Sequence, residues 1–539
     1  MPSSSSHYLV VSSLCALLVC GTANAAASSA ETRNLTELRN TVVNLLNALV
    51  ERGVVTREQA QAMVKDAQAK AEAESAATAA QDKAEEGAVR VPYVPEIVKD
   101  QIRKEVLAEL GPSVTKEVVE KVRSEDTLRA ALPDWVQRMR WSGDVRVRAQ
   151  GDVFADGNVP GGYLDFNNIN DKGGATKAGL GALVNVSEDR ERLRARLRFG
   201  FDVDMGSGWS AAMRIATGTL RDAVSTNQTL GNYGARYTIG VDQAYLRWVS
   251  PAKSFNLSAG RIPNPWMSTE LVFDPDLMFE GAVANYRLNL GSGERYAHNI
   301  FATAGAFPLQ EIELSAHDKW LYAGQLGIDW RTSGGHRFRL GAAYYDYRNI
   351  AGQANAPDSV LLDYTAPPFF QRGNTVFDIR NDTDNTTNLY ALASDFQLAD
   401  VTASAEWRMF SAYRIGVTAD YVKNVGYDAA KIQARTGRDV PERTEGYQAE
   451  LGFGSYALDQ AGMWRAAVGY RYLERDAVID AFTDSDFRLG GTDVKGYTLT
   501  LDYMLTPRVT GRLRYLSGNE IDGPPFGVDV IQLDVNAQF

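Results

Sequence analysis

Segment 190–205 constrains the fold of this chain most strongly, because charged and apolar residues alternate along it. Successive side chains of a β-strand point to opposite faces, so the segment has one apolar face and one charged face. A strand that separates lipid from water, as in a transmembrane β-barrel, has this pattern. The apolar face comprises Leu193, Ala195, Leu197, Phe199, Phe201 and Val203, and the charged face comprises Arg192, Arg194, Arg196, Arg198 and Asp202.

The chain ends on a second segment with a period of two, residues 528–539. Ile531, Leu533 and Val535 share one face of this segment, and the chain stops at Phe539. A strand of about ten residues is long enough to cross a bilayer at a tilt. An edge strand of a soluble sandwich is the alternative for this segment alone. We expect Phe539 to act as the membrane-insertion signal that the barrel-assembly machinery recognises.

The N-terminal end has the features of a secretory signal. An apolar run over residues 8–20 precedes a small-x-small cleavage site at Ala23 and Ala25, which predicts a signal peptide over residues 1–25. Both cysteines, Cys15 and Cys20, lie inside it. The mature chain therefore has no thiol, which excludes disulfides and cysteine-ligated metals.

Residues 26–132 have a helical pattern, rich in Ala, Glu, Lys and Gln. Apolar residues recur every three or four positions over residues 35–49, as in a short coiled coil. We expect a mainly helical periplasmic region here. Solvated helices without a partner, a coiled coil that trimerises the barrel, and helices that contact peptidoglycan all fit the pattern.

From residue 141 to 539 the period is two, and we assign this range to the transmembrane barrel. Short Gly-, Pro- or Ser-rich turns alternate with long connections, as they do when both termini lie in the periplasm. Residues 401–409 also alternate, but bacterial barrels have even strand numbers, so we expect this segment to form an extended turn or a short helix. The sixteen expected strands cover residues 144–149, 190–205, 209–219, 237–249, 255–262, 279–290, 297–307, 319–330, 337–347, 388–398, 413–423, 446–456, 463–473, 496–505, 508–516 and 528–539.

Inward-facing charges are the candidate site, because charge rings and constrictions set the selectivity of a pore. The long connection at 263–278 carries acids that could face a wall of arginines and set a field across a narrowed channel. These acids could instead only keep the rim soluble, with the arginines pairing locally. The predicted pore-lining residues are Arg192, Arg194, Arg196, Arg198, Arg214, Arg247 and Arg261, and the predicted constriction residues are Glu270, Asp274, Asp276 and Glu280.

No signature of a metal or catalytic site stands out. His298, His317 and His336 are scattered, without the spacing of zinc ligands. We find no P-loop, no nucleophile elbow and no Ser-His-Asp pattern, and we predict no cofactor. The net charge of -11 argues against nucleic-acid binding through a basic field.

Several motifs are similar to those of one known family. They are the helix–turn segment 50–60, residues 141–148 at the start of the barrel, residues 190–201, residues 260–266, residues 420–424 and the terminal Phe539. Over nearly the whole mature chain, the sequence resembles the Putative porin family of proteobacterial outer membranes. The resemblance implies passive diffusion of solutes through the outer membrane, without catalytic residues or cofactors.

The sequence thus predicts an all-β antiparallel transmembrane barrel of about sixteen strands behind a helical periplasmic region. We expect a porin, in contact with the lipid of a Gram-negative outer membrane and assembled as a homotrimer, that passes small polar solutes or ions. One alternative is a structural anchor whose helices contact peptidoglycan. Another is a barrel enzyme that uses one of the three histidines at its rim.

Overall fold

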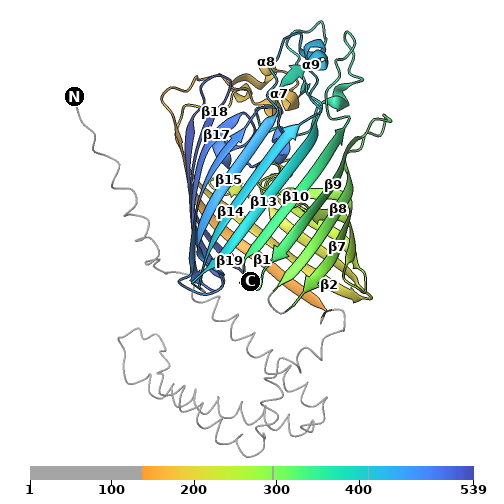
Figure 1. Cartoon of the computed structure of the whole chain (residues 1–539). Coiled ribbons are helices and arrows are strands. Elements are labelled where there is room, and N and C mark those ends of the chain that lie inside the picture. Colours follow the sequence, from red (N-terminus) through yellow and green to blue (C-terminus); the bar gives the residue numbers. More distant parts are fainter. Residues whose placement is uncertain (1–135, 137, 294–295, 411) are drawn as a thin grey trace, which may run out of the picture. The chain divides into compact units, whose positions relative to one another are not determined.

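A closed antiparallel barrel forms the described part of the chain (Figure 1). The structure is a computed structural model and describes residues 136, 138–293, 296–410 and 412–539. In these residues sixteen strands build the wall, and the two-residue strand β4 joins the same sheet. The expected signal peptide (1–25) and helical region (26–132) lie outside the described residues.

The wall strands follow one another around the barrel in chain order, and every neighbouring pair is antiparallel. They are β1 (Met139–Phe154), β2 (Arg190–Gly206), β3 (Trp209–Thr217), β5 (Ile239–Val249), β6 (Phe255–Pro263), β7 (Met278–Ser292), β8 (Ala297–Gln310), β9 (Lys319–Arg331), β10 (Arg337–Arg348), β13 (Gln397–Met409), β14 (Tyr413–Asn424), β15 (Glu445–Ser455), β16 (Trp464–Leu473), β17 (Val494–Thr506), β18 (Val509–Glu520) and β19 (Val528–Gln538). The short strand β4 (Gln228–Thr229) pairs with β2.

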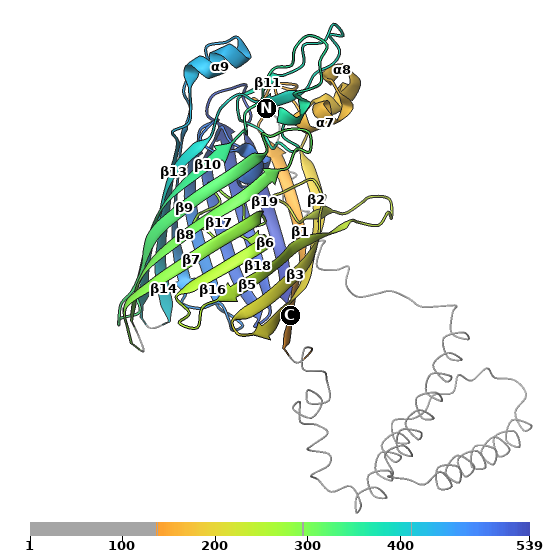
Figure 2. The same ribbon diagram turned by 90° about the vertical axis from the view of Figure 1, so that its right-hand side faces the viewer.

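The two ends of the barrel differ in their connections. One end carries short turns together with the C-terminus, and the other carries the long connections (Figure 1, Figure 2). Three described α-helices lie in the long connections: α7 (Phe166–Lys172), α8 (Ala175–Ala178) and α9 (Ala429–Thr436). None of the described helices has the length and apolar character needed to cross a membrane. We call the two ends the short-turn end and the long-loop end.

The period of two gives each strand one outer and one inner face. In β19, Leu533 and Val535 are about half exposed on the outer face, whereas Gln532 and Asp534 are buried on the inner face. Large aromatic residues cluster near the short-turn end, where Trp141 stacks on Phe199 with 5.4 Å between ring centroids. An apolar outer face with aromatic residues at its edge suits a protein surrounded by lipid.

The expected strand at 388–398 is wrong, although the count of sixteen holds. Residues 401–409, which we assigned to a turn or short helix, belong to β13, and residues 390–392 form β12 (Tyr390–Leu392), which pairs with β11 (Val376–Asp378). The reason lies in packing: Ala391 and Ala393 belong to a separate apolar cluster with Phe377 and Ile379 in the long connection. The alternating residues there form a small two-stranded sheet, β11 with β12, and not a strand of the barrel wall.

Side chains from the long connections form a hydrophobic core inside the long-loop half. Leu271 and Phe273, from the connection between β6 and β7, are buried there with Ile479 and Phe487, from the connection between β16 and β17. Inward residues of many wall strands complete the core, for example Phe307 of β8. The lumen is therefore narrowed in this half, and polar cavities lie toward the short-turn end.

Closure of the barrel brings Phe539 onto Gly143 of β1. Their backbone groups exchange two hydrogen bonds of 3.0 Å, and a Cβ added to Gly143 would lie 2.7 Å from the Phe539 ring and from the Arg198 carbonyl oxygen. Gly151 lies in the same strand with no atom within 4 Å of such a Cβ.

We therefore predict that Gly143→Ala destabilises the barrel by about 1–3 kcal/mol, because the extra methyl group overpacks the β1–β19 seam. The measurement is the temperature at which the folded barrel loses its faster mobility in a detergent gel. Gly151→Ala is the matched control and should unfold at the same temperature as the wild type. Equal unfolding temperatures for the two variants would contradict this account of the seam.

Candidate functional site: the charged constriction

The connection between β6 and β7, which we call the inner loop (residues 264–277), folds into the lumen and binds the opposite wall. The backbone of Met267 exchanges two hydrogen bonds of 2.9 and 2.8 Å with the side-chain amide of Gln325 in β9. The backbone N–H and the hydroxyl of Thr269 both donate to Asp420 in β14, at 3.1 and 2.6 Å. Polar inner-face residues of distant strands thus fix the loop across the lumen.

A second connection, between β16 and β17, packs on the inner loop, and we call it the adjoining loop (residues 474–493). The N–H of Asp274 donates to the carbonyl of Phe482 at 2.8 Å, and the N–H of Ser485 donates to the Asp274 carboxylate at 2.9 Å. Burial, together with the charges of Asp484 and Asp276, raises the pKa of Asp274 well above its usual range. Asp274 therefore joins the two loops and is shielded from water.

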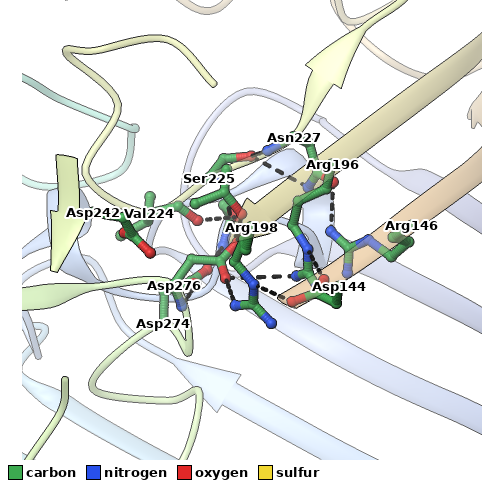
Figure 3. A network of polar contacts seen from close by, with 12 residues as sticks. Asp144, Arg146, Arg196, Arg198, Val224, Ser225, Asn227, Asp242, Asp274 and Asp276 are labelled. Carbon is green, nitrogen blue, oxygen red and sulfur yellow. Dashed lines mark hydrogen bonds and ion pairs between the residues drawn. The ribbon is translucent and has the colours of Figure 1, made fainter. Parts of the chain in front are cut away.

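The predicted arginine row of β2 faces the lumen, and most of it is paired. Arg196 and Arg198 both bind Asp144 of β1, at 2.6 and 2.7 Å (Figure 3). Both also reach Asp276 of the inner loop, at 3.7 and 3.3 Å. Asp276 therefore ties the inner loop to the arginine row, as the sequence suggested for an acid of this loop.

The other two arginines of the row differ from each other. Arg192 binds Asp152 of β1 at 2.5 Å. Arg194 donates to Gln150 at 3.3 Å and to Ser225 at 3.5 Å, and it makes no ion pair with a described carboxylate. Local pairing, the alternative that the sequence left open, thus accounts for much of the row.

Acids of the adjoining loop complete the constriction, and sequence reasoning missed them. Asp486 accepts two hydrogen bonds of 3.0 Å from Arg148 and lies 3.4 Å from Arg514, and Asp484 binds Arg471 at 2.9 Å. Burial alone would raise the pKa of Asp486, but the charges of Arg148, Arg514 and Arg194 outweigh burial and lower it. The only signal in the sequence was an Asp-x-Asp pair in a long connection, which resembles a solvated turn.

Three predicted acids reach different partners. Glu270 of the inner loop lies 3.2 Å from Arg514 on the far wall, and Asp276 faces β2. Glu280 does not belong to the loop: it lies in β7 and pairs with Arg261 at 2.5 Å. The assignment of Glu280 to the constriction loop is therefore corrected, because strand β7 begins at Met278.

The three remaining predicted arginines lie at three different places in the barrel. Arg214 of β3 binds Asp242 on the inner face at 2.5 Å, and Arg247 of β5 lines a different cavity of the lumen. Arg261 occupies the opposite face of β6 from the inward Ser258 and Ile262, so its assignment to the pore lining is corrected. The physical reason is strand parity, since 261 falls between two inward positions.

Three polar cavities adjoin the constriction. The central cavity, about 300 Å³, is lined by six arginines and six carboxylates, among them Arg198, Asp276 and Asp486. A second, the basic cavity, measures about 600 Å³ and is lined by five cationic side chains and the single carboxylate of Asp329. A third of about 430 Å³ lies against β14 to β18. Charged groups therefore line the lumen below the hydrophobic core.

The histidines do not form a site in the described part of the chain. His298 stacks on Trp330 with 3.9 Å between ring centroids, and His336 accepts a hydrogen bond from the Arg408 N–H at 3.2 Å. His317 lies in the connection before β9. Among described residues, no group of three His, Cys, Asp or Glu side chains is placed to hold a metal ion.

The closed barrel, its apolar outer face and its charged lumen define an outer-membrane, channel-like β-barrel. A family model described as Putative porin matches residues 39–539, and the chain belongs to this family. No curated protein matches the sequence significantly.

Several solved outer-membrane proteins are similar in structure to this chain. The high-pH structure of Pseudomonas putida OprB is 11% identical, with a TM-score of 0.43, covering 79% of this chain and 96% of that chain. A loop-deletion mutant of Vibrio cholerae OmpT is 12% identical, with a TM-score of 0.39, covering 74% and 99%. The Acinetobacter baumannii channel DcaP is 13% identical, with a TM-score of 0.37, covering 74% and 97%.

The adjoining loop should respond to pH through its buried carboxyls, and Asp480 is one of them. Burial raises the pKa of this carboxyl to about 7, and its ordinary value is 3.8. The folded loop then binds the proton more tightly than the unfolded loop does. The stability it contributes is full below about pH 4 and is lost as pH rises through about 7, by an amount on the order of a few kcal/mol.

We predict faster hydrogen exchange in residues 474–493 at about pH 8 than at about pH 5, after correction for the intrinsic rate. Asp480→Asn should reduce this difference, because the amide does not ionise. The part that remains belongs to the other buried carboxyls of the loop, such as Asp476, whose pKa burial raises to about 6. Asp459→Asn, in an exposed turn, should retain it. The prediction is wrong if Asp480→Asn exchanges like the wild type at both pH values.

Proposed function

We propose that this chain forms a constricted, water-filled channel through which small polar solutes or ions diffuse passively across the outer membrane. The observation that carries the proposal is the charged constriction: arginines of β1, β2 and β18 face carboxylates that two inward-folded loops bring to them. Fixed charges of both signs across a narrow passage favour hydrated polar solutes and disfavour apolar ones. The constriction thus acts as a filter.

The size of the barrel supports the proposal. A barrel of sixteen strands is wide enough to leave an aqueous lumen, unlike an eight-stranded barrel that side chains fill. Here loops narrow that lumen, and Arg, Asp, Glu, Asn and Thr side chains are among those that line the cavities that remain. We therefore expect a conductance well below that of an unobstructed barrel of this size.

The orientation and assembly belong to the same proposal. We place the short-turn end in the periplasm, because bacterial outer-membrane barrels carry short turns there. A homotrimer, contact of residues 26–132 with peptidoglycan and recognition of Phe539 by the assembly machinery remain predictions. An enzymatic role is not part of the proposal.

The experiment is single-channel recording of the purified chain in a planar bilayer, with a salt gradient. Discrete ohmic steps with a measurable reversal potential are the expected result. Its sign reports whether cationic or anionic groups dominate the open path. A correctly folded barrel that never conducts overturns the channel and favours a structural anchor.

We predict that Asp276→Asn raises the conductance and its noise. The substitution weakens a charge-assisted hydrogen bond from Arg198 and removes an ion pair with Arg196, together worth about 2 kcal/mol, so the inner loop leaves the wall more often. Current traces of the reconstituted variant provide the measurement. The matched control is Glu280→Gln, which neutralises a carboxylate of the outer-face pair with Arg261 and should conduct as the wild type does. Equal current traces for the two variants would show that the contacts of Asp276 with the arginine row do not hold the inner loop.

A further inference from the structure

The cationic side chains of the basic cavity differ from the arginine row in having few partners. In the described part of the chain, Arg247, Arg287 and Lys253 make no ion pair and no side-chain hydrogen bond. The one lining carboxylate, Asp329, is occupied by two hydrogen bonds of 2.8 and 2.7 Å from Arg337. The cavity thus holds uncompensated positive charge in a chain with a net charge of -11.

Arg339 completes this cluster from β10. It donates one hydrogen bond of 3.0 Å, to the hydroxyl of Ser404, and it makes no ion pair with a described carboxylate. A guanidinium has five N–H donors, so most of its donors are left for a ligand. Arginine binds carboxylate and phosphate groups through two parallel hydrogen bonds, which makes these the groups that such a cluster recognises.

Neutral polar groups between the arginines add further donors. Asn285 of β7 donates to the Asn256 oxygen at 3.1 Å and accepts from the Thr303 hydroxyl at 2.8 Å. These bonds fix the orientation of the Asn256 amide, whose nitrogen donates to no described residue. An oriented amide beside guanidinium groups favours an oxyanion.

The spacing of the arginines points to a ligand with more than one acidic group. Arg247 lies on β5, Arg287 lies two strands further round the wall on β7, and Arg339 lies three strands beyond that on β10. A single small ion held by Arg247 is therefore out of reach of Arg339. The cavity of about 600 Å³ has room for an organic molecule, and Tyr245, Trp266 and Phe301 offer apolar surface to a carbon skeleton.

We infer that the basic cavity is a binding subsite for small multivalent organic anions, molecules that carry two or more carboxylate or phosphate groups. The inference rests on the proposed function and deepens it, since it names the solute class that the channel concentrates. The constriction filters by paired charges, whereas the basic cavity, on the short-turn side of it, attracts anions through unpaired ones. A weak subsite raises local solute concentration and still permits release.

The test is calorimetric titration of the full chain, purified in detergent, with citrate and with acetate at matched ionic strength. Citrate should bind measurably more tightly than acetate. Arg247→Ala with Arg287→Ala should weaken citrate binding about tenfold or more, because two groups that would pair with the ligand are lost. A control that removes the same charge elsewhere is Arg348→Ala with Arg438→Ala, in the long-loop half, and it should bind as the wild type does.

The outcomes separate the inference from the proposed function. If citrate binds no better than acetate, or if the Arg247/Arg287 variant binds citrate as the wild type does, the subsite is overturned, whatever the barrel conducts. If the folded protein binds citrate but never conducts in a bilayer, the channel is overturned and the subsite stands. Gel mobility of the folded barrel shows that each variant has kept its fold.

Discussion

A strand in lipid has no water to satisfy its backbone, and every other feature of this barrel depends on how that constraint is met. The sheet closes on itself when β1 pairs with β19 from Asp144 opposite Gln538 to Phe154 opposite Val528. Closure also sets which inward-facing side chains of β1 and β19 lie side by side. It places Arg148 of β1 beside Asp534 of β19, with bonds of 2.7 and 2.9 Å, and within reach of the same Asp486 that Arg514 approaches. The charged constriction therefore depends on the closed seam.

The loops inside the lumen follow from the cost of burying charge. A guanidinium taken out of water is destabilising unless a carboxylate or another acceptor replaces the lost hydration. Asp276, Asp484 and Asp486 supply these acceptors from loops that also bury Leu271 and Phe273 in the core. Apolar burial and charge pairing thus act on the same segments. Such loops are expected to hold one arrangement, since releasing either contact exposes the other to an unfavourable environment.

Much of the fold could be predicted from the sequence, because a period of two reports which face of a strand meets lipid. Segments 190–205 and 528–539 form strands with the predicted faces. The prediction failed at 388–398, where alternating residues pack in a local sheet, and at Arg261, which lies between two inward positions and so faces outward. It also could not find Asp484 and Asp486, because their partners are set by tertiary packing. The local pattern of a strand is visible in one sequence, whereas the inward path of a loop is not.

The lumen contains cationic groups that are paired with carboxylates and others that are not, and the two kinds respond differently to salt. Arg196 and Arg148 lie in contact with carboxylates and are largely buried, so mobile ions screen these pairs weakly. Arg247 and Arg287 are exposed within a wide cavity, and their field on a solute extends over about 10 Å at 0.1 M salt and shrinks as salt rises. The architecture of the constriction should therefore persist at high ionic strength while the proposed attraction of anions fades. A row of arginines in a barrel sequence is thus weak evidence for anion selectivity until the partners of each one are known.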